Sequence, residues 1–127
     1  RKDLQLCKEI SKLLGIDYIN PKNSLEIKYL ISHSKLVFTS RYHGLISSLE
    51  TGVVPIVFGW SHKYKEILSE FNLTHLLITD PQQELDTLLN SLVEPELKNI
   101  QRSIKKQSAK AKLSLEAMWE ELFSKLQ

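Results

Sequence analysis

Short apolar stretches that alternate with amphipathic helical stretches constrain the fold of this chain more than any other feature. The stretches KLVFTS (35–40), VVPIVFGW (53–60) and THLLITD (74–80) are apolar and rich in branched side chains, as expected of strands covered on both faces. Helical spacing of apolar residues follows each of them. Strands that alternate with helices form a parallel sheet with helices packed against it. We therefore predict an α/β fold with a Rossmann-like parallel sheet flanked by helices.

The first third of the chain predicts two helices and one more strand. Apolar residues recur at helical spacing over residues 3–14. The stretch IDYIN (16–20) alternates briefly between polar and apolar residues and predicts a short strand. A second helix is expected to start after a cap at Asn23 or Ser24.

Three further helices are expected to follow the three strands. The first starts at Tyr42 and ends at Gly52, which suits a left-handed cap. SHKYKEILSEF (61–71) predicts the second helix. QQELDTLLNSLV (82–93) predicts the third, which should end near Pro95 because proline cannot continue a helix.

A single apolar stripe predicts a long terminal helix over residues 96–127, either continuous or broken around Ser108. The stripe consists of Leu97, Ile100, Ile104, Ala111, Leu115, Met118, Leu122 and Leu126. Packing of the stripe on the chain's own sheet is the simpler expectation. A stripe left partly bare would instead promote a homodimer through the terminal helix.

Composition indicates one globular domain over residues 1–127. The net charge is only +2, and the one basic cluster (100–112) suits a solvated helix face, so no nucleic-acid partner is expected. No apolar run is long enough for a membrane span. With Cys7 as its single cysteine the chain has no internal disulfide, which favours a cytoplasmic location.

Arg41 and His43 stand where the strand KLVFTS ends and a helix begins. In parallel sheets, ligands bind at such strand-to-helix junctions. The N–H groups of a first helical turn favour an anion, and a guanidinium offers paired donors to a carboxylate or phosphate. Gly44, without a side chain, would let a ligand approach the backbone. The alternative is an ordinary surface arginine and a histidine bonded to a neighbouring carbonyl, and position alone does not decide between the two.

His62 and Lys63 follow the next strand and should reach the same edge of the sheet. Lys63 could bind a second anionic group, and His62 could assist proton transfer. The alternative is a solvated helix start capped by Ser61. Trp60 could form an aromatic wall for a sugar or pack against the sheet edge. The four histidines and the one cysteine lack the spacing of a zinc motif, so neither a metal nor a cofactor is predicted.

The segment SRYHGLISSLETGVVPIVFGWSHKYKEILSEFNL (40–73) resembles the signature region of the polysaccharide pyruvyl transferase family. In that region a strand leads to Arg-x-His, then to a helix of small residues, a glycine, a proline in the next strand and an aromatic/His/Lys stretch. Here these features are Arg41, His43, Gly52, Pro55 and residues 59–63. Glu50 departs from the small residues that prevail in this helix among relatives.

The resemblance implies an enzyme that transfers the pyruvyl group of phosphoenolpyruvate to two hydroxyls of a sugar, forming a cyclic ketal and releasing phosphate. Arg41 and His43 are implied to meet phosphoenolpyruvate, the donor substrate, and a saccharide is the acceptor. Histidine titrates near neutral pH, so His43 could be the general acid or a phosphate ligand. The family also resembles a two-domain glycosyltransferase-B arrangement. This chain would then be most of its C-terminal domain, inactive without the N-terminal one.

Two other functions remain open from the residues. A glycosyltransferase-B domain that binds a nucleotide sugar would place Arg41 and Lys63 on the diphosphate, with Glu66 or Glu70 on the ribose. A non-catalytic α/β interaction module is also compatible with the fold. In that case the side chains of Arg41, His43 and Lys63 are expected to point away from one another.

Overall fold

Three parallel strands form the sheet of this chain, in a computed structural model that describes residues 2–59 and 61–126. The strands are β1 (Leu36–Thr39), β2 (Val54–Phe58) and β3 (Leu77–Ile78), in the spatial order β1-β2-β3. Both neighbouring pairs are parallel. This arrangement confirms the predicted α/β fold. The last strand is shorter than the stretch 74–80 because Thr74–Leu76 form a 3₁₀ turn.

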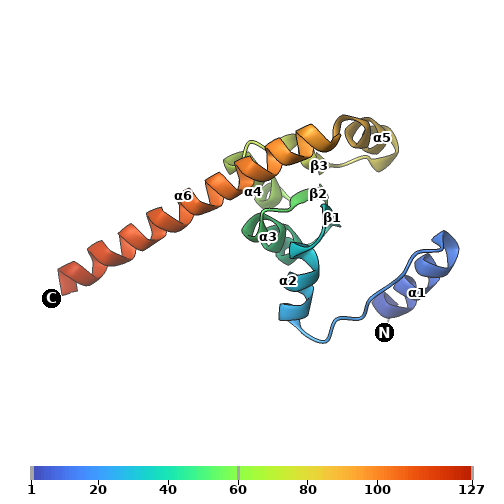
Figure 1. Cartoon of the computed structure of the whole chain (residues 1–127), viewed down its shortest axis with the longest axis horizontal. Coiled ribbons are helices and arrows are strands. Elements are labelled where there is room, and N and C mark those ends of the chain that lie inside the picture. Colours follow the sequence, from blue (N-terminus) through green and yellow to red (C-terminus); the bar gives the residue numbers. More distant parts are fainter. Residues whose placement is uncertain (1, 60, 127) are drawn as a thin grey trace.

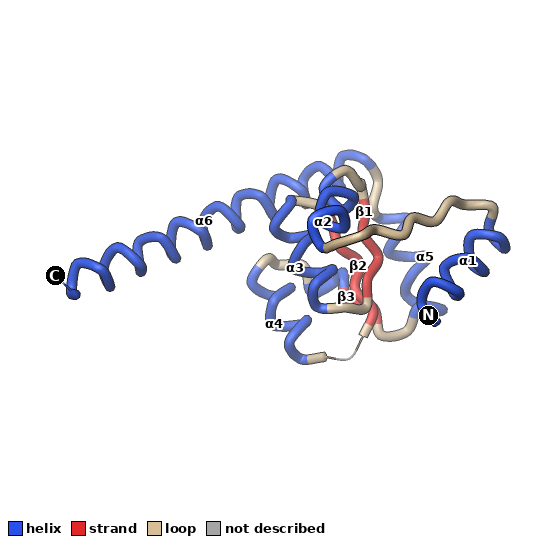
Figure 2. Tube along the Cα trace, turned by 90° about the horizontal axis from the view of Figure 1, so that it is seen from below, coloured by secondary structure: helices blue, strands red, loops and turns tan. Residues whose placement is uncertain are grey.

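A helix follows each strand, as the alternating pattern predicts. These helices are α3 (Tyr42–Thr51), α4 (His62–Glu70) and α5 (Pro81–Ser91). Figure 2 shows α3 and α4 on one side of the sheet and α5 on the other. Gly52 ends α3 in the left-handed conformation (φ 76°), and its amide donates to the carbonyls of the last turn. The predicted cap is confirmed.

The core lies around the central strand β2. Val54, Ile56 and Val57 are completely buried, so both faces of the strand are covered. Leu45 of α3 and Leu68 of α4 are also completely buried. The neighbouring strand β1 is not covered on both faces, contrary to expectation, since none of its residues is buried and Phe38 is 48% exposed at the sheet edge. Its pairing with β2 along its whole length places the carboxyl ends of the two strands next to each other.

The N-terminal segment lies outside this core. It consists of α1 (Lys2–Leu14), an irregular stretch and α2 (Ser24–Ser32), whose cap is Asn23. Figure 1 shows α1 set apart from the sheet. The strand predicted at residues 16–20 is wrong, since this stretch is exposed and irregular. Its first peptide group bonds back to α1, where the amide of Ile16 donates to the Ser11 carbonyl at 3.2 Å.

The terminal helix α6 (Glu94–Leu126) is continuous and begins two residues earlier than predicted. Pro95 lies in its first turn, where no amide hydrogen bond is lost, instead of ending α5. The helix continues through Ser108, whose hydroxyl donates to the carbonyl of Leu49 in α3 at 3.0 Å. Leu97, Ile100 and Ile104 are buried in the core, so the first half of the stripe packs on the chain's own fold.

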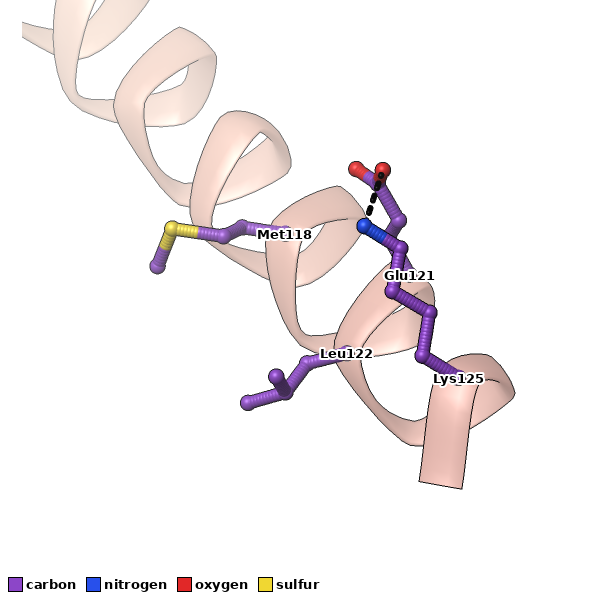
Figure 3. A pocket seen from close by; sticks show the side chains of 4 residues that line it. All are labelled: Met118, Glu121, Leu122 and Lys125. Carbon is purple, nitrogen blue, oxygen red and sulfur yellow. Dashed lines mark ion pairs between the residues drawn. The ribbon is translucent and has the colours of Figure 1, made fainter. Parts of the chain in front are cut away.

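Beyond residue 108, α6 extends away from the rest of the fold (Figure 1), and its apolar side chains are exposed where the structure describes them. Leu113, Met118, Leu122 and Leu126 are each about half exposed or more, and the side chain of Leu115 lies outside the described residues. Figure 3 shows Met118 and Leu122 projecting from the helix near the Glu121–Lys125 ion pair, whose charged atoms are 3.5 Å apart. Among the described residues, no helix combines the length and the apolar character that crossing a membrane requires.

Candidate functional site

The carboxyl ends of β1 and β2 bring the starts of α3 and α4 to one edge of the sheet. Ser40 and Arg41 connect β1 to α3, and residues 59–61 connect β2 to α4. The strands are parallel and paired in register, with Thr39 opposite Val57. The two junctions therefore lie side by side, as the sequence predicts.

The structure links these two junctions through tyrosine side chains. The ammonium nitrogen of Lys63 lies 4.0 Å from the centre of the Tyr42 ring, a cation–π contact. The Tyr64 hydroxyl donates a hydrogen bond of 3.1 Å to the carbonyl of Ser40. The sequence does not identify either tyrosine as part of the site, because neither residue type nor spacing shows which side chains they contact.

His43 belongs to the same group of side chains. Its ring centre is 5.8 Å from that of Tyr42, with the two planes at 72°. Tyr42 therefore contacts a basic residue on each helix, His43 on α3 and Lys63 on α4. Both are exposed to solvent, so a ligand at this edge of the sheet can reach them.

Arg41 is the cap residue of α3 and is exposed. Its backbone is extended, and its amide donates to the Thr39 hydroxyl at 3.1 Å. The other helices that follow β2 and β3 have side-chain caps, since Ser61 accepts from the amide of Lys63 and Asp80 from that of Gln82. Arginine has no acceptor to offer, so the side chain of the cap residue does not cap the first amides of α3. A helix start of this kind, with an arginine at its cap position, favours an anion.

Gly44 packs directly against Thr39 at the end of β1. A Cβ atom built on Gly44 would lie 2.3 Å from the Thr39 hydroxyl oxygen and 2.9 Å from its Cβ. The strand and the first turn of α3 can pack this closely only because residue 44 has no side chain. This requirement is steric and separate from the predicted approach of a ligand, which stays a prediction.

His62 and Ser61 lie at the start of α4. The Ser61 cap is confirmed by a 3.2 Å bond from the amide of Lys63. His62 is the exposed first residue of α4. Its predicted part in proton transfer stays a prediction, and the prediction for Trp60 lies outside the described residues.

The structure explains two other polar residues near this edge and on α3. Asp80 caps α5. Glu50 forms an ion pair of 2.6 Å with Lys28 of α2, which accounts for an acidic residue near the end of α3. Among the described residues, no group of three or more His, Cys, Asp or Glu side chains is arranged to hold a metal ion.

The fold and this edge define an α/β domain with basic side chains at two neighbouring strand-to-helix junctions. The sequence profile of the Polysaccharide pyruvyl transferase family matches residues 2–62. The resemblance that the ordered motif predicts is thereby confirmed over a segment that contains Arg41 and His43 and ends one residue before Lys63.

A curated relative extends the similarity beyond this segment. General stress protein 30 of Bacillus subtilis (strain 168) is 31% identical over 94 residues, which cover 69% of this chain and 27% of that protein. The chain thus spans about a quarter of the length of this relative. No solved structure matches the chain significantly.

Proposed function

We propose that this chain is the C-terminal domain of a pyruvyl transferase. The enzyme would move the pyruvyl group of phosphoenolpyruvate onto a sugar of a surface polysaccharide as a ketal. The observation that carries the proposal is the position of the family motif. Arg41 and His43 follow β1 within the matched segment, and Lys63 from the next junction contacts the ring of Tyr42, the residue between them.

The donor substrate suits these residues. Phosphoenolpyruvate carries a carboxylate and a phosphate, and Arg41 can bind one of them with two parallel hydrogen bonds. Lys63 can meet the other as a point charge. Two anionic groups on one small molecule would explain why basic residues come from two helices.

The reaction also requires a proton. The methylene carbon of phosphoenolpyruvate gains a proton and becomes a methyl group, and the central carbon forms bonds to two sugar oxygens. The bond from that carbon to the phosphate oxygen breaks, and phosphate leaves with the second hydroxyl proton. His43 is the candidate general acid for the first proton or a ligand of the departing phosphate.

The rest of such an enzyme is proposed to lie outside this chain, since the match covers only 27% of the curated relative. An N-terminal domain of the glycosyltransferase-B type would supply the saccharide site and a catalytic base. The isolated chain is then expected to be inactive. Its bare helix end (113–126) is a surface through which two copies could pair as a homodimer.

The two alternative functions are supported less well. An interaction module would leave Lys63 and His43 free to point apart, whereas both contact the Tyr42 ring. A nucleotide-sugar site would need a ribose ligand, and Glu66 and Glu70 are both exposed on α4 without a contact that marks either one.

The decisive experiment uses the full-length protein with phosphoenolpyruvate and a saccharide acceptor, and it measures phosphate release. His43→Ala should lower the rate at least about 100-fold, the usual effect of removing a general acid. His33→Ala is the matched control, because His33 is also exposed but precedes β1 and bonds to Tyr29 within α2. Unchanged activity in His43→Ala would remove His43 from both roles. Stronger thermal stabilisation by a nucleotide sugar than by phosphoenolpyruvate would favour the alternative enzyme.

A further inference from the structure

Tyr42 and Tyr64 connect the two strand-to-helix junctions in opposite directions. Tyr42 is the first residue of α3, and its ring receives the ammonium group of Lys63 from α4. Tyr64 lies in the first turn of α4, and its hydroxyl donates to the backbone just before α3. Each helix start therefore contacts the other through an aromatic side chain.

The ring of Tyr64 also lies close to Gly59, the residue that follows β2. A Cβ atom built on Gly59 would lie 3.4 Å from the Tyr64 ring, and the backbone there has φ 153°. The ring thus lies directly over residue 59. This packing fixes the first turn of α4, and with it the backbone of Lys63, relative to Ser40.

The backbone position alone would not fix the Lys63 ammonium. A lysine side chain has many rotamers, and holding it in one of them for a ligand costs conformational entropy. Lys63 is exposed, and its contact with Tyr42 restricts where the ammonium can lie. The same ring has His43 as its other basic neighbour.

We infer that Tyr42 is a positioning residue of a phosphate site. Its ring holds the Lys63 ammonium beside His43, so that side chains from two helices meet one phosphate group. The inference rests on the proposed function for the source of this group, the phosphate of phosphoenolpyruvate. The chemistry of recognition, an ammonium and an imidazole facing a phosphate dianion, is the same for inorganic phosphate.

The first test measures the contact in the ligand-free chain by NMR. A side chain over an aromatic face has its proton resonances shifted upfield, so the Lys63 ε-methylene signals should be displaced. The displacement should persist in Tyr42→Phe, which keeps the ring, and disappear in Tyr42→Leu. Tyr29→Leu, which removes an exposed tyrosine of α2, is the control. Undisplaced Lys63 signals in the unmodified chain would overturn the inference.

The second test measures the affinity of the chain for inorganic phosphate. Tyr42→Leu should raise the dissociation constant about 2- to 5-fold, the effect of one exposed cation–π contact, and Tyr42→Phe should leave it near the unmodified value. In a chain that already carries Lys63→Met, adding Tyr42→Leu should not change the dissociation constant for phosphate any further. A purely structural role would weaken binding equally with or without Lys63 and would overturn the inference, as would the absence of phosphate binding.

The tests separate this inference from the proposed function. Phosphate binding that depends on Tyr42 and Lys63, in a protein that does not use phosphoenolpyruvate, would refute the function and support the site. Pyruvyl transfer with equal phosphate affinity in Tyr42→Leu and Tyr42→Phe would support the function and refute the role of Tyr42. If Tyr42→Leu does not fold, two other measurements still test the contact. These are the Lys63 signals of the unmodified chain and the dissociation constants for phosphate of Tyr42→Phe and Lys63→Met.

Discussion

Replacing Gly44 by alanine tests whether the close packing of α3 on β1 holds the site. The new Cβ atom would lie 2.3 Å from the Thr39 hydroxyl oxygen, about 1 Å inside ordinary van der Waals contact. Thr39 is β-branched and has few rotamers with which to move away. Turning it would also remove the hydrogen bond that its hydroxyl accepts from the amide of Arg41.

The expected cost follows from these contacts. Forcing an atom into a packed site costs about 1–3 kcal/mol, and the lost hydrogen bond adds about 1 kcal/mol. The higher helix propensity of alanine offsets about 1 kcal/mol. Gly44→Ala should therefore lower the free energy of unfolding by about 1–3 kcal/mol. Urea denaturation of the chain measures this as a lower midpoint with an unchanged slope.

A double substitution identifies the cause. Thr39→Ala removes the oxygen at 2.3 Å and leaves the Thr39 Cβ at 2.9 Å, so it should rescue Gly44→Ala in part. The two changes should then be non-additive, as expected of residues in contact. A Gly44→Ala chain as stable as the original would refute the steric argument. Unchanged stability with weaker phosphoenolpyruvate binding would instead assign Gly44 to the ligand.

Three other substitutions test separate parts of the structure. Ser61→Ala should destabilise the chain by about 1 kcal/mol in urea denaturation because it removes the cap of α4, and Ser61→Asp should retain the stability; equal loss in both would contradict the cap. Ile104→Ala should cost about 2–5 kcal/mol because the side chain is 1% exposed, whereas Leu126→Ala, at 75% exposed, should change stability by less than about 0.5 kcal/mol. Leu122→Glu should convert a homodimer to monomers in sedimentation equilibrium, and a monomeric unmodified chain would rule out pairing through α6.

The order of the elements could be predicted from the sequence where local pattern and packing agree. The strands β1 and β2 and the caps Asn23, Gly52 and Ser61 follow from local residue choice. The stretch 16–20 has the alternation of a strand but has no neighbouring strand to pair with. Pro95 was expected to end a helix and lies in the first turn of the next one, and both positions suit a residue without an amide hydrogen.

The site was predictable only in part for a similar reason. The edge of the sheet that carries Arg41, His43 and Lys63 follows from the parallel strand pattern. The contact between Lys63 and Tyr42 depends on how two helices pack and joins residues 21 positions apart in the chain, which no local pattern contains. The role of Gly44 against Thr39 is hidden for the same reason, since it appears only when the strand and helix are packed together.

The two halves of α6 differ in what keeps them helical. Up to Ser108 the helix is stabilised by the core and by α3, whereas its last turns depend on the sequence of the helix itself. An unsupported helix frays from its end, because isolated helices of this length are marginal in water. Amide hydrogen exchange should therefore be slow near Ile104 and become progressively faster toward Leu126. A partner bound to the exposed end of α6 would extend the slowly exchanging region along the same helix. Hydrogen exchange would therefore detect this binding even if the fold did not change.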